Sequence, residues 1–242
     1  MSQLQTLCSL FIGLFPASTL KNRLLRWNGH RIAPSAHIGP ILLLTSVLSI
    51  EPGAKLSGFS VYLRSHIVLG NQAFIGSFNW VAGSPELIRT APKIGYTVPG
   101  QLTLDSQAAI TSRHYIDTSG GVRFGSFSTL AGARSTVFTH GIDYAQGVLR
   151  TSPVKIGEYS IINSNVSITP GSSVPPYSIV AMGSVVTKAI NEPLRLYAGI
   201  PARAKRKLSA HARAFQRLVG EIPPASVGST TTHSAGLDKP SK

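Results

Sequence analysis

The sequence predicts an all-β solenoid, a prism whose three flat faces each take one six-residue repeat. The first evidence is an unbroken array of apolar residues at every sixth position: Ile32, Ile38, Leu44, Ile50, Leu56, Tyr62, Val68, Phe74 and Trp80. Helices repeat at about 3.6 residues and half-buried strands at about 2, so a sustained period of six is typical of a parallel β-helix built from hexapeptides.

A second array near the end of the chain keeps the same period: Ile156, Ile162, Ile168, Val174, Val180 and Val186. The residues four places after its members are small or β-branched, which suits a crowded interior beside a turn: Ser160, Val166, Ser172, Ser178 and Ser184. A shorter middle array is Leu104, Ile110, Ile116 and Val122. It then slips by two residues to Phe124 and Leu130, which predicts a bulge or a lengthened corner.

Length and composition indicate one domain with appendages. A chain of 242 residues with 43% hydrophobic content can bury one sizeable core, and a solenoid needs no second domain. Its single cysteine, Cys8, excludes an internal disulfide and suits a reducing compartment. The seven histidines form no H-x-x-x-H pair, so we expect no metal.

A formal net charge of +14 points to an anionic partner. The candidates are nucleic acid, membrane phosphates, an acidic glycan and a phosphorylated cofactor. The basic residues are dispersed and no aromatic and basic nucleic-acid motif is visible, so we expect no nucleic acid. No apolar run reaches the roughly 18 to 20 residues that a membrane-spanning helix needs.

Residues 1–30 predict a cap of two helices. Leu4, Leu7, Cys8, Phe11, Ile12 and Phe15 have helical spacing, and a second helix from Ser18 carries Leu20, Leu24 and Leu25 opposite Lys21, Arg23 and Arg26. The favoured interpretation is that the pair closes the open end of the solenoid. The alternative is that this basic amphipathic pair makes peripheral contact with a membrane surface.

The coils are expected over residues 31–205, with excursion loops at about 83–100 and 139–153. The first excursion contains Pro85, Pro92 and Pro99, and the second contains His140, Asp143 and Tyr144. Loops that leave a rigid repeat scaffold commonly carry function. A basic C-terminal helix is expected from about Ser209 to Val219, within residues 206–220. The tail at 221–242 is rich in Pro, Ser, Thr and Gly and is expected to be disordered.

Three late segments carry a resemblance to a known family. They are residues 154–171 (VKIGEYSIINSNVSITPG), 183–188 (GSVVTK) and 198–203 (AGIPAR). They resemble the C-terminal coils of the hexapeptide-repeat acyltransferases, most closely the galactoside, maltose and capsular polysaccharide O-acetyltransferase branch. The resemblance implies a left-handed parallel β-helix, a homotrimer, and active sites in clefts between subunits, where acetyl-CoA lies along the coils.

The resemblance also implies a catalytic histidine. The family's histidine follows a threonine just ahead of an excursion and upstream of an Ile-Gly hexad, and here Thr139-His140 precedes Ile156-Gly157. An imidazole can take the proton of a sugar hydroxyl as that oxygen attacks the thioester, with no acyl-enzyme. Asp143 is the nearest carboxylate in sequence and is the candidate to orient the His140 ring. Its alternative role is to stabilise a turn.

Candidate acceptor contacts are Arg113, His114, Asp117 and Tyr144. The first three lie where the galactoside branch carries a substrate-contacting asparagine, and the segment ending at Asp117 echoes the one ending at Asp143. The alternative is structural, with His114 a satisfied corner residue and Asp117 a turn former. Backbone amides near Gly132 or Asn163 are candidates for an oxyanion site.

The residues that the resemblance assigns to acetyl-CoA come from the last coils: Asn163, Ser164, Asn165, Gly183, Ser184, Ala202, Arg203 and Lys207. Arginine and lysine suit its phosphates. The alternative for the basic residues around Lys207 is a charged surface with no ligand. The family often has Trp-Ile-Gly where this chain has Ile161-Ile162-Asn163, so the acceptor is left open.

The leading functional hypothesis is an acetyl-CoA-dependent O-acetyltransferase acting on a sugar or polysaccharide repeat unit, free or lipid-linked. One alternative is an N-acetyltransferase of an amino sugar or antibiotic. The other is a catalytically idle trimeric β-helix that serves as a binding module. The expected location is the cytoplasm, including the inner face of the membrane.

Overall fold

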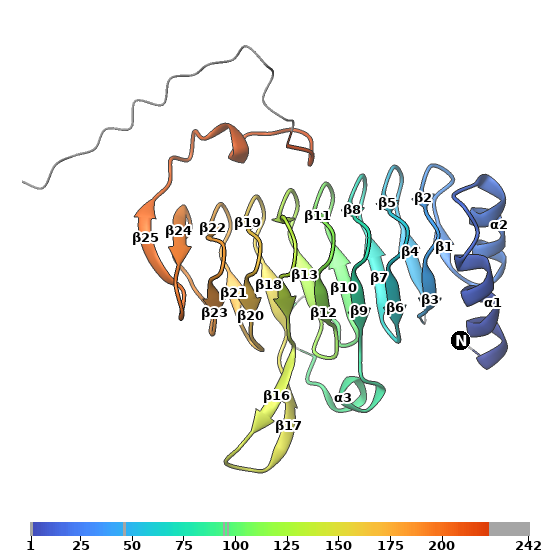
Figure 1. The fold of residues 1–242 in the computed structure, drawn as a ribbon, viewed down its shortest axis with the longest axis horizontal. Helices are drawn as coiled ribbons and strands as arrows, with labels where there is room; N and C mark the ends of the chain where they lie inside the picture. The colour runs from blue at the N-terminus through green and yellow to red at the C-terminus, as the bar shows by residue number, and fades with distance from the viewer. Residues whose placement is uncertain (1, 46, 94, 96, 223–242) are drawn as a thin grey trace, which may run out of the picture.

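The protein is described here by a computed structural model, which covers residues 2–45, 47–93, 95 and 97–222. The chain visits three parallel sheets in turn and returns to the first after each round, so that successive coils stack along one axis (Figure 1). The predicted arrangement of parallel strands on three faces is therefore confirmed.

The first sheet contains β1 (Arg31–Ile32), β4 (Leu48–Ile50), β7 (His66–Leu69), β10 (Gln101–Leu104), β13 (Val122–Phe124), β18 (Val154–Ile156) and β21 (Ser173–Val174). The second contains β2 (His37–Ile38), β5 (Lys55–Leu56), β8 (Phe74–Ile75), β11 (Ala109–Ile110), β14 (Thr129–Leu130), β19 (Ile161–Ile162), β22 (Ile179–Val180), β24 (Arg195–Ala198) and β25 (Arg203–Lys207). The third contains β3 (Leu42–Leu44), β6 (Val61–Leu63), β9 (Trp80–Ala82), β12 (Tyr115–Asp117), β15 (Thr136–Val137), β20 (Ser167–Ile168) and β23 (Val185–Val186).

The core is a set of ladders that run along the axis. Ile162, for example, pairs with Leu130 in one neighbouring strand and with Val180 in the other. All six members of the second predicted array are buried, as are the small residues four places after them. Each apolar side chain thus stacks on its counterpart one coil away, which is how strands of two or three residues form a continuous core.

The first array is only partly right. Ile38, Leu56 and Tyr62 are buried as predicted, but Trp80 is 44% exposed and its neighbour Val81 is fully buried. Three further predicted positions each lie one residue from a buried one: Leu44 follows the buried Leu43, Val68 lies between the buried Ile67 and Leu69, and Phe74 precedes the buried Ile75. The reason is that the corners differ in length: the buried Leu43 follows Ile38 by five residues, whereas the buried Leu69 follows Tyr62 by seven, and each such difference shifts a strict six-residue count by one.

The corners that lead from the third sheet to the first hold the largest departures from the regular coil. One holds helix α3 (Pro85–Thr90), the next is lengthened after Asp117, and the next holds a hairpin of β16 (His140–Asp143) and β17 (Val148–Thr151). The lengthened corner confirms the two-residue slip between Val122 and Phe124, both buried. Helix α3 and the hairpin project from the same side of the prism (Figure 1), and α3 contacts β17.

Two helices close one end of the prism, α1 (Gln3–Gly13) and α2 (Thr19–Trp27), as predicted (Figure 1). Their orientation differs from the prediction, because Lys21 is fully buried and Leu20 is 60% exposed. The Lys21 ammonium donates to the carbonyls of Gly13 (2.7 Å), Phe15 (2.8 Å) and Gly39 (2.7 Å). Burial lowers the pKa of Lys21 to about 8. Lys21 therefore ties both ends of the α1–α2 connection to the first coil.

The other end of the prism is closed by β25, which pairs antiparallel with β24. The helix predicted from Ser209 to Val219 is wrong, since only a 3-10 turn at Arg213–Phe215 forms there. The segment packs instead along a column of stacked corner rings, Phe127, Tyr159 and Tyr177, with Phe215 edge-on to Tyr177 at 5.8 Å. Because the segment follows this column of rings, its backbone does not form the expected helix, and tertiary contact overrides helical propensity.

Residues 223–242, most of the tail predicted to be disordered, lie outside the described residues. Within the described part of the chain, no helix is long and apolar enough to span a bilayer.

Candidate active site

The central feature of the site is a histidine held by a carboxylate from the coil below. His140 begins β16, and its Nδ1 lies 2.8 Å from Oδ2 of Asp117, the last residue of β12. The two residues are 23 apart in sequence. They meet because β12 and β15 are parallel neighbours in the third sheet, which brings the ends of both strands to one edge.

The Asp117 carboxylate is buried, with only 3% of the residue exposed, yet it is saturated with donors. Oδ2 accepts from the Thr139 amide (2.8 Å), the Thr139 hydroxyl and His140, while Oδ1 accepts from the amide (3.1 Å) and the hydroxyl (2.6 Å) of Ser119. Burial by itself raises the pKa of the Asp117 carboxyl, but the bonds from Ser119, Thr139 and His140 outweigh it and hold the pKa below its ordinary value. Asp117 is therefore a fixed negative charge.

The bond to Asp117 sets the tautomer of the neutral His140 ring. An ionised carboxylate only accepts hydrogen bonds, so Nδ1 must carry a proton, and in the neutral ring Nε2 is left as the basic atom. Nε2 makes no hydrogen bond to any described residue, and 34% of the side chain is exposed. The arrangement thus holds an accessible base in one orientation and one tautomer.

The loop under the histidine is held by backbone contacts. The Gly120 amide donates to the Thr139 hydroxyl (2.8 Å), and the Ser152 amide donates to the Thr139 carbonyl (2.8 Å), which closes the base of the β16–β17 hairpin. A Cβ on Gly120 would lie 2.9 Å from the carbonyl oxygens of both Thr139 and Ser152. Only glycine fits where the lengthened corner and the hairpin base meet.

Asp143 does not orient His140, contrary to the sequence-based expectation. Its Oδ2 accepts from Nε of Arg150 at 2.6 Å, and its Oδ1 accepts from the amides of Ala145 (3.1 Å) and Gln146 (3.2 Å). Contact with Arg150 and these amides lowers the pKa of the Asp143 carboxyl. The alternative role as a turn stabiliser is the one observed. Tyr144, at the hairpin tip, is 93% exposed.

His114 is also placed differently from the expectation. It is 2% exposed, its Nδ1 accepts from the Ser135 amide (3.2 Å), and its Nε2 lies 3.0 Å from the Thr111 hydroxyl. Burial lowers its pKa to about 4. His114 is therefore the satisfied corner residue of the alternative interpretation. Arg113 is exposed at the same corner, with its guanidinium 6.0 Å from the centre of the Phe78 ring.

Most of the residues assigned to acetyl-CoA lie where the second sheet leads into the third. Asn163, Ser164 and Asn165 form one such corner and Gly183 and Ser184 the next, with the Gly183 amide donating to the Ser164 carbonyl (3.1 Å). The third sheet's strands separate this edge from the His140 edge, and those strands are only two or three residues long. The backbone amide of Asn163, a candidate oxyanion donor, is bonded to the Val180 carbonyl (3.1 Å).

The remaining cofactor candidates lie at the end of the prism. Ala202 is buried, whereas Arg203 and Lys207 are exposed at the two ends of β25. Arg203 also borders a hollow of about 550 Å³ beside Lys188 and Glu192. No group of acidic, histidine or cysteine side chains suited to a metal occurs among the described residues.

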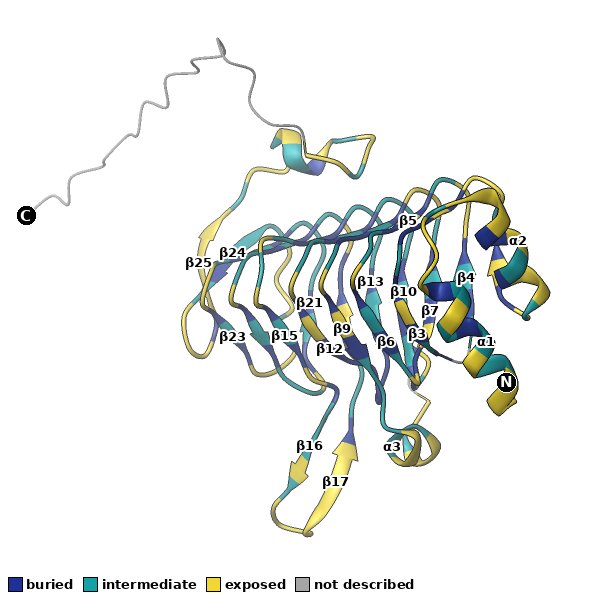
Figure 2. Cartoon of the chain, turned by 45° about the vertical axis from the view of Figure 1, so that its right-hand side comes forward, coloured by how far each residue is buried: buried dark blue, intermediate teal, exposed yellow. Residues whose placement is uncertain are grey.

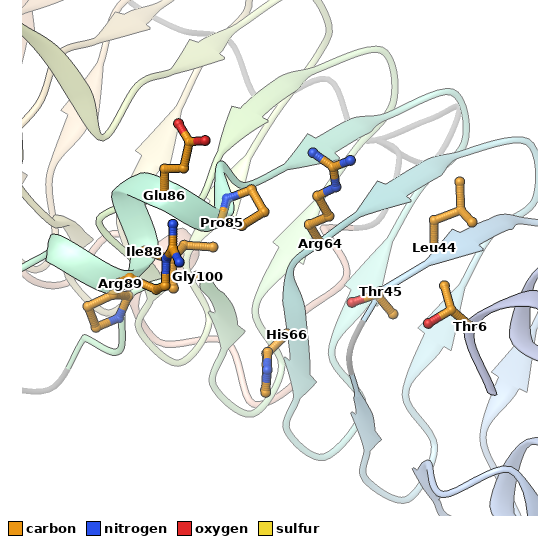
Figure 3. A pocket seen from close by; sticks show the side chains of 11 residues that line it. Thr6, Leu44, Thr45, Arg64, His66, Pro85, Glu86, Ile88, Arg89 and Gly100 are labelled. Carbon is orange, nitrogen blue, oxygen red and sulfur yellow. The ribbon is translucent and has the colours of Figure 1, made fainter. Parts of the chain in front are cut away.

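A cleft of about 670 Å³ lies on the same edge of the prism as His140. Figure 3 shows Thr6 of α1 and Arg64 of the corner after β6 on one side, and Glu86 and Arg89 of α3 on the other. Helix α3 contacts β17, the strand that pairs with β16. Helix α3 therefore lines the cleft and also contacts the hairpin that begins at His140, although no residue of that hairpin lines the cleft itself.

The fold has counterparts among solved structures. The N-acyltransferase AntD from Bacillus cereus, crystallised with coenzyme A and dTDP-4-amino-4,6-dideoxyglucose, superposes with a TM-score of 0.53 at 16% identity, over 80% of this chain and 91% of AntD. The polysialic acid O-acetyltransferase OatWY superposes with a TM-score of 0.51 at 17% identity, over 74% and 84%. No family model and no curated protein matches the sequence. At this identity the likeness establishes a shared fold: the chain folds as these acyltransferases do.

Sequence reasoning missed the roles of two residues at the site. Ser119 and Thr139 hold the carboxylate of Asp117, which was expected to contact the acceptor. One signal pointed there, because the slip in the middle array falls on the polar, glycine-containing stretch from Asp117 to Gly121. Outside the site, the sequence also showed no sign of Asn79, whose Oδ1 accepts from the His114 backbone amide at 2.8 Å.

Proposed function

We propose that this protein is an acetyl-CoA-dependent O-acetyltransferase that transfers an acetyl group to a hydroxyl of a sugar or polysaccharide repeat unit. The observation that carries the proposal is the His140–Asp117 pair, with one ring nitrogen held by a buried carboxylate and the other accessible. A shared fold with AntD and OatWY supports acyl transfer. We take the coil to be left-handed, as the sequence resemblance implies.

In the proposed reaction, Nε2 of His140 removes the proton of the acceptor hydroxyl as its oxygen attacks the thioester carbonyl. The C–S bond then breaks, and the imidazolium returns its proton to the leaving thiolate of CoA. Asp117 holds the ring and stabilises the imidazolium. Such a base matters most for a hydroxyl, because a neutral amine attacks without prior deprotonation, and this favours an O-acetyl product over an N-acetyl one.

The cofactor is proposed to lie along the corners around Ser164 and Gly183, with its phosphates near Arg203 and Lys207. The thioester then has to cross only the short strands of the third sheet to reach His140. Packing of three prisms side by side into a homotrimer, as the resemblance implies, would place a neighbouring chain against this groove.

The acceptor is proposed to occupy the cleft between α3 and the corner after β6. Arg64 and Arg89, both exposed, line it beside a single carboxylate, Glu86. Cationic walls suit a glycan that carries carboxylate or phosphate groups.

The test is acetyl transfer from acetyl-CoA to a panel of neutral and acidic sugars, with His140→Gln as the variant. The wild type should form a product that hydroxylamine cleaves, which identifies it as an ester. The kcat of His140→Gln should be lower by at least about 10²-fold. The variant should still bind CoA by calorimetry. Retention of the wild-type rate by His140→Gln contradicts the catalytic role, and absence of CoA binding by the wild type contradicts the transferase itself.

A further inference from the structure

The helices that close the prism expose an unusual amount of apolar surface. Seven large apolar side chains of α1, α2 and their connection are at least 47% exposed: Leu4, Leu7, Phe11, Leu14, Phe15, Leu20 and Trp27. Figure 2 shows exposed residues along both helices at this end of the coil. A cluster of this kind in one place, unlike scattered surface apolar residues, marks an interaction surface.

The apolar residues of α1 form a stripe. At about 100° per residue, Leu4, Leu7 and Phe11 fall within one narrow sector, and Leu14 and Phe15 extend it beyond the helix end. The side of α1 that faces the coil carries the buried Ser9 and Gly13, and Ile12 packs partly buried against the core. A Cβ on Gly13 would lie 2.7 Å from the Ile41 carbonyl oxygen, so close packing on the coil requires this side.

Helix α2 also exposes large apolar side chains. Lys21 and Asn22 are buried beside Leu25 and bonded to backbone carbonyls, while Leu20 and Trp27 are 60% and 91% exposed. Leu20 and Trp27 are two helical turns apart and lie on one face, with the exposed Arg23 between them. The cap thus buries Leu25 together with its small and polar residues, and leaves most of its large apolar side chains exposed.

Charge on this end of the chain is of one sign. The first fifty residues contain Lys21, Arg23, Arg26 and Arg31 and no aspartate or glutamate, although the whole chain has nine acidic residues. Two copies of the surface meeting face to face would bring like charges together. An anionic surface with an apolar interior matches both the cations and the stripe.

We propose that α1 and α2 dock the protein on the surface of a bilayer containing anionic lipid. The apolar stripe of α1 and the ring of Trp27 enter the boundary between headgroups and acyl chains, and Arg23 and Arg26 contact the phosphates. The helices lie on the membrane without crossing it, in keeping with their lengths of 11 and 9 residues. Thr6 of α1 also lines the cleft beside α3, so docking brings one end of the cleft toward the lipid surface.

The direct test is tryptophan fluorescence with vesicles. Trp80→Phe leaves Trp27 as the one tryptophan of the chain, without touching the cap. Vesicles of phosphatidylcholine with about a third phosphatidylglycerol should shift its emission to the blue, and phosphatidylcholine alone should shift it far less. An emission spectrum unchanged by anionic vesicles overturns the proposal. This readout needs no catalysis, so it is independent of the proposed acetyl transfer.

Co-sedimentation with the same vesicles supplies the matched variants. Leu7→Ser with Phe11→Ser should abolish pelleting, whereas Phe59→Ser should not, although Phe59 and Phe11 are similarly exposed at 68% and 65%. Arg23→Gln should weaken partitioning about fivefold. Acetyl transfer to a soluble acceptor should be unchanged in all three variants.

Two further results overturn the inference. One is equal pelleting of the Leu7→Ser, Phe11→Ser variant and the wild type. The other combines two measurements: the wild type does not bind vesicles, and light scattering gives the variant half the particle mass of the wild type. That result would make the face a contact between copies of the chain.

Discussion

Oδ2 of Asp117 lies 2.8 Å from Nδ1 of His140, and the same oxygen accepts the backbone amide of Thr139, the residue before the histidine. One buried carboxylate thus fixes both the backbone that carries the ring and the ring itself. Under the proposed function, Asp117 is a positioning residue, since it would act on the reaction through His140.

Asp117→Asn should therefore lower kcat by about 10² to 10⁴-fold while KM and CoA affinity change little. The asparagine cannot hold the ring tautomer as a carboxylate does. Steady-state kinetics and calorimetry measure the effect, with the melting temperature checking the fold. Asp143→Asn is the matched control, because that carboxylate bonds Arg150 and not the ring, and its rate should stay within about twofold of wild type. Equal losses in the two variants would contradict the assignment.

Stability should fall on mild acidification because of two buried histidines. Burial lowers the pKa of His30 and of His114 to about 4, below the value near 6.5 of an unfolded chain. The unfolded state therefore binds more protons than the folded state between these values, so their stabilisation is complete above pH 6.5 and is lost as the pH falls toward 4. Each histidine should cost about 2 kcal/mol by pH 5.

Urea unfolding at pH 7.5 and pH 5 measures this loss. His114→Gln should reduce the difference between the two pH values, and His37→Gln, at an exposed position, should leave it unchanged. A wild-type free energy of unfolding that is the same at both pH values would refute the prediction.

Lys21→Met should lower the free energy of unfolding by about 2 to 4 kcal/mol. The substitution leaves the carbonyls of Gly13, Phe15 and Gly39 buried without their shared donor. Arg23→Met on the same helix is the control and should change stability by no more than about 0.5 kcal/mol, because Arg23 is exposed. Chemical denaturation distinguishes the two, and equal effects would show that the carbonyl contacts contribute little.

Gly157→Ala should destabilise the protein by about 1 to 3 kcal/mol through overpacking. A Cβ at this position would lie 2.4 Å from the Pro176 nitrogen, and that atom belongs to the rigid corner of the next coil. Glu158→Ala, at the exposed neighbouring position, should have a much smaller effect. A melting temperature for Gly157→Ala equal to that of wild type would mean that the corner yields freely.

Much of the fold could be predicted from the sequence because a prism imposes its period on every coil. The array from Ile156 to Val186 is buried throughout, since each of its corners has the same length. The array ending at Trp80 loses register, because an extra residue in an upstream corner cannot be seen in the apolar pattern alone. The prediction of a C-terminal helix was wrong for a different reason. Phe215 and Arg217 contact a column of aromatic rings at the corners, and these contacts form in place of a helix.

The site was less predictable than the fold. His140 could be found because it follows a threonine just before the chain leaves the coil, but its partner could not be found from proximity in sequence. Asp143 is three residues from His140 along the chain and bonds Arg150, whereas Asp117 is 23 residues away and adjacent in space. In a stacked coil the nearest neighbours of a residue lie about one coil away, so sequence distance misleads wherever corners vary in length.

Helix α3 and the β16–β17 hairpin emerge from one edge of the prism, and the ladders continue beneath them without interruption. Because stacked repeats contribute to stability locally, these two insertions can be exchanged or lengthened with little effect on coils farther along the axis. Under the proposed function, chimeras that take α3 and the part of the hairpin beyond His140 from another protein of this fold would acquire a new acceptor preference on an unchanged base and scaffold. The architecture separates the part that evolution can vary from the part that it must keep.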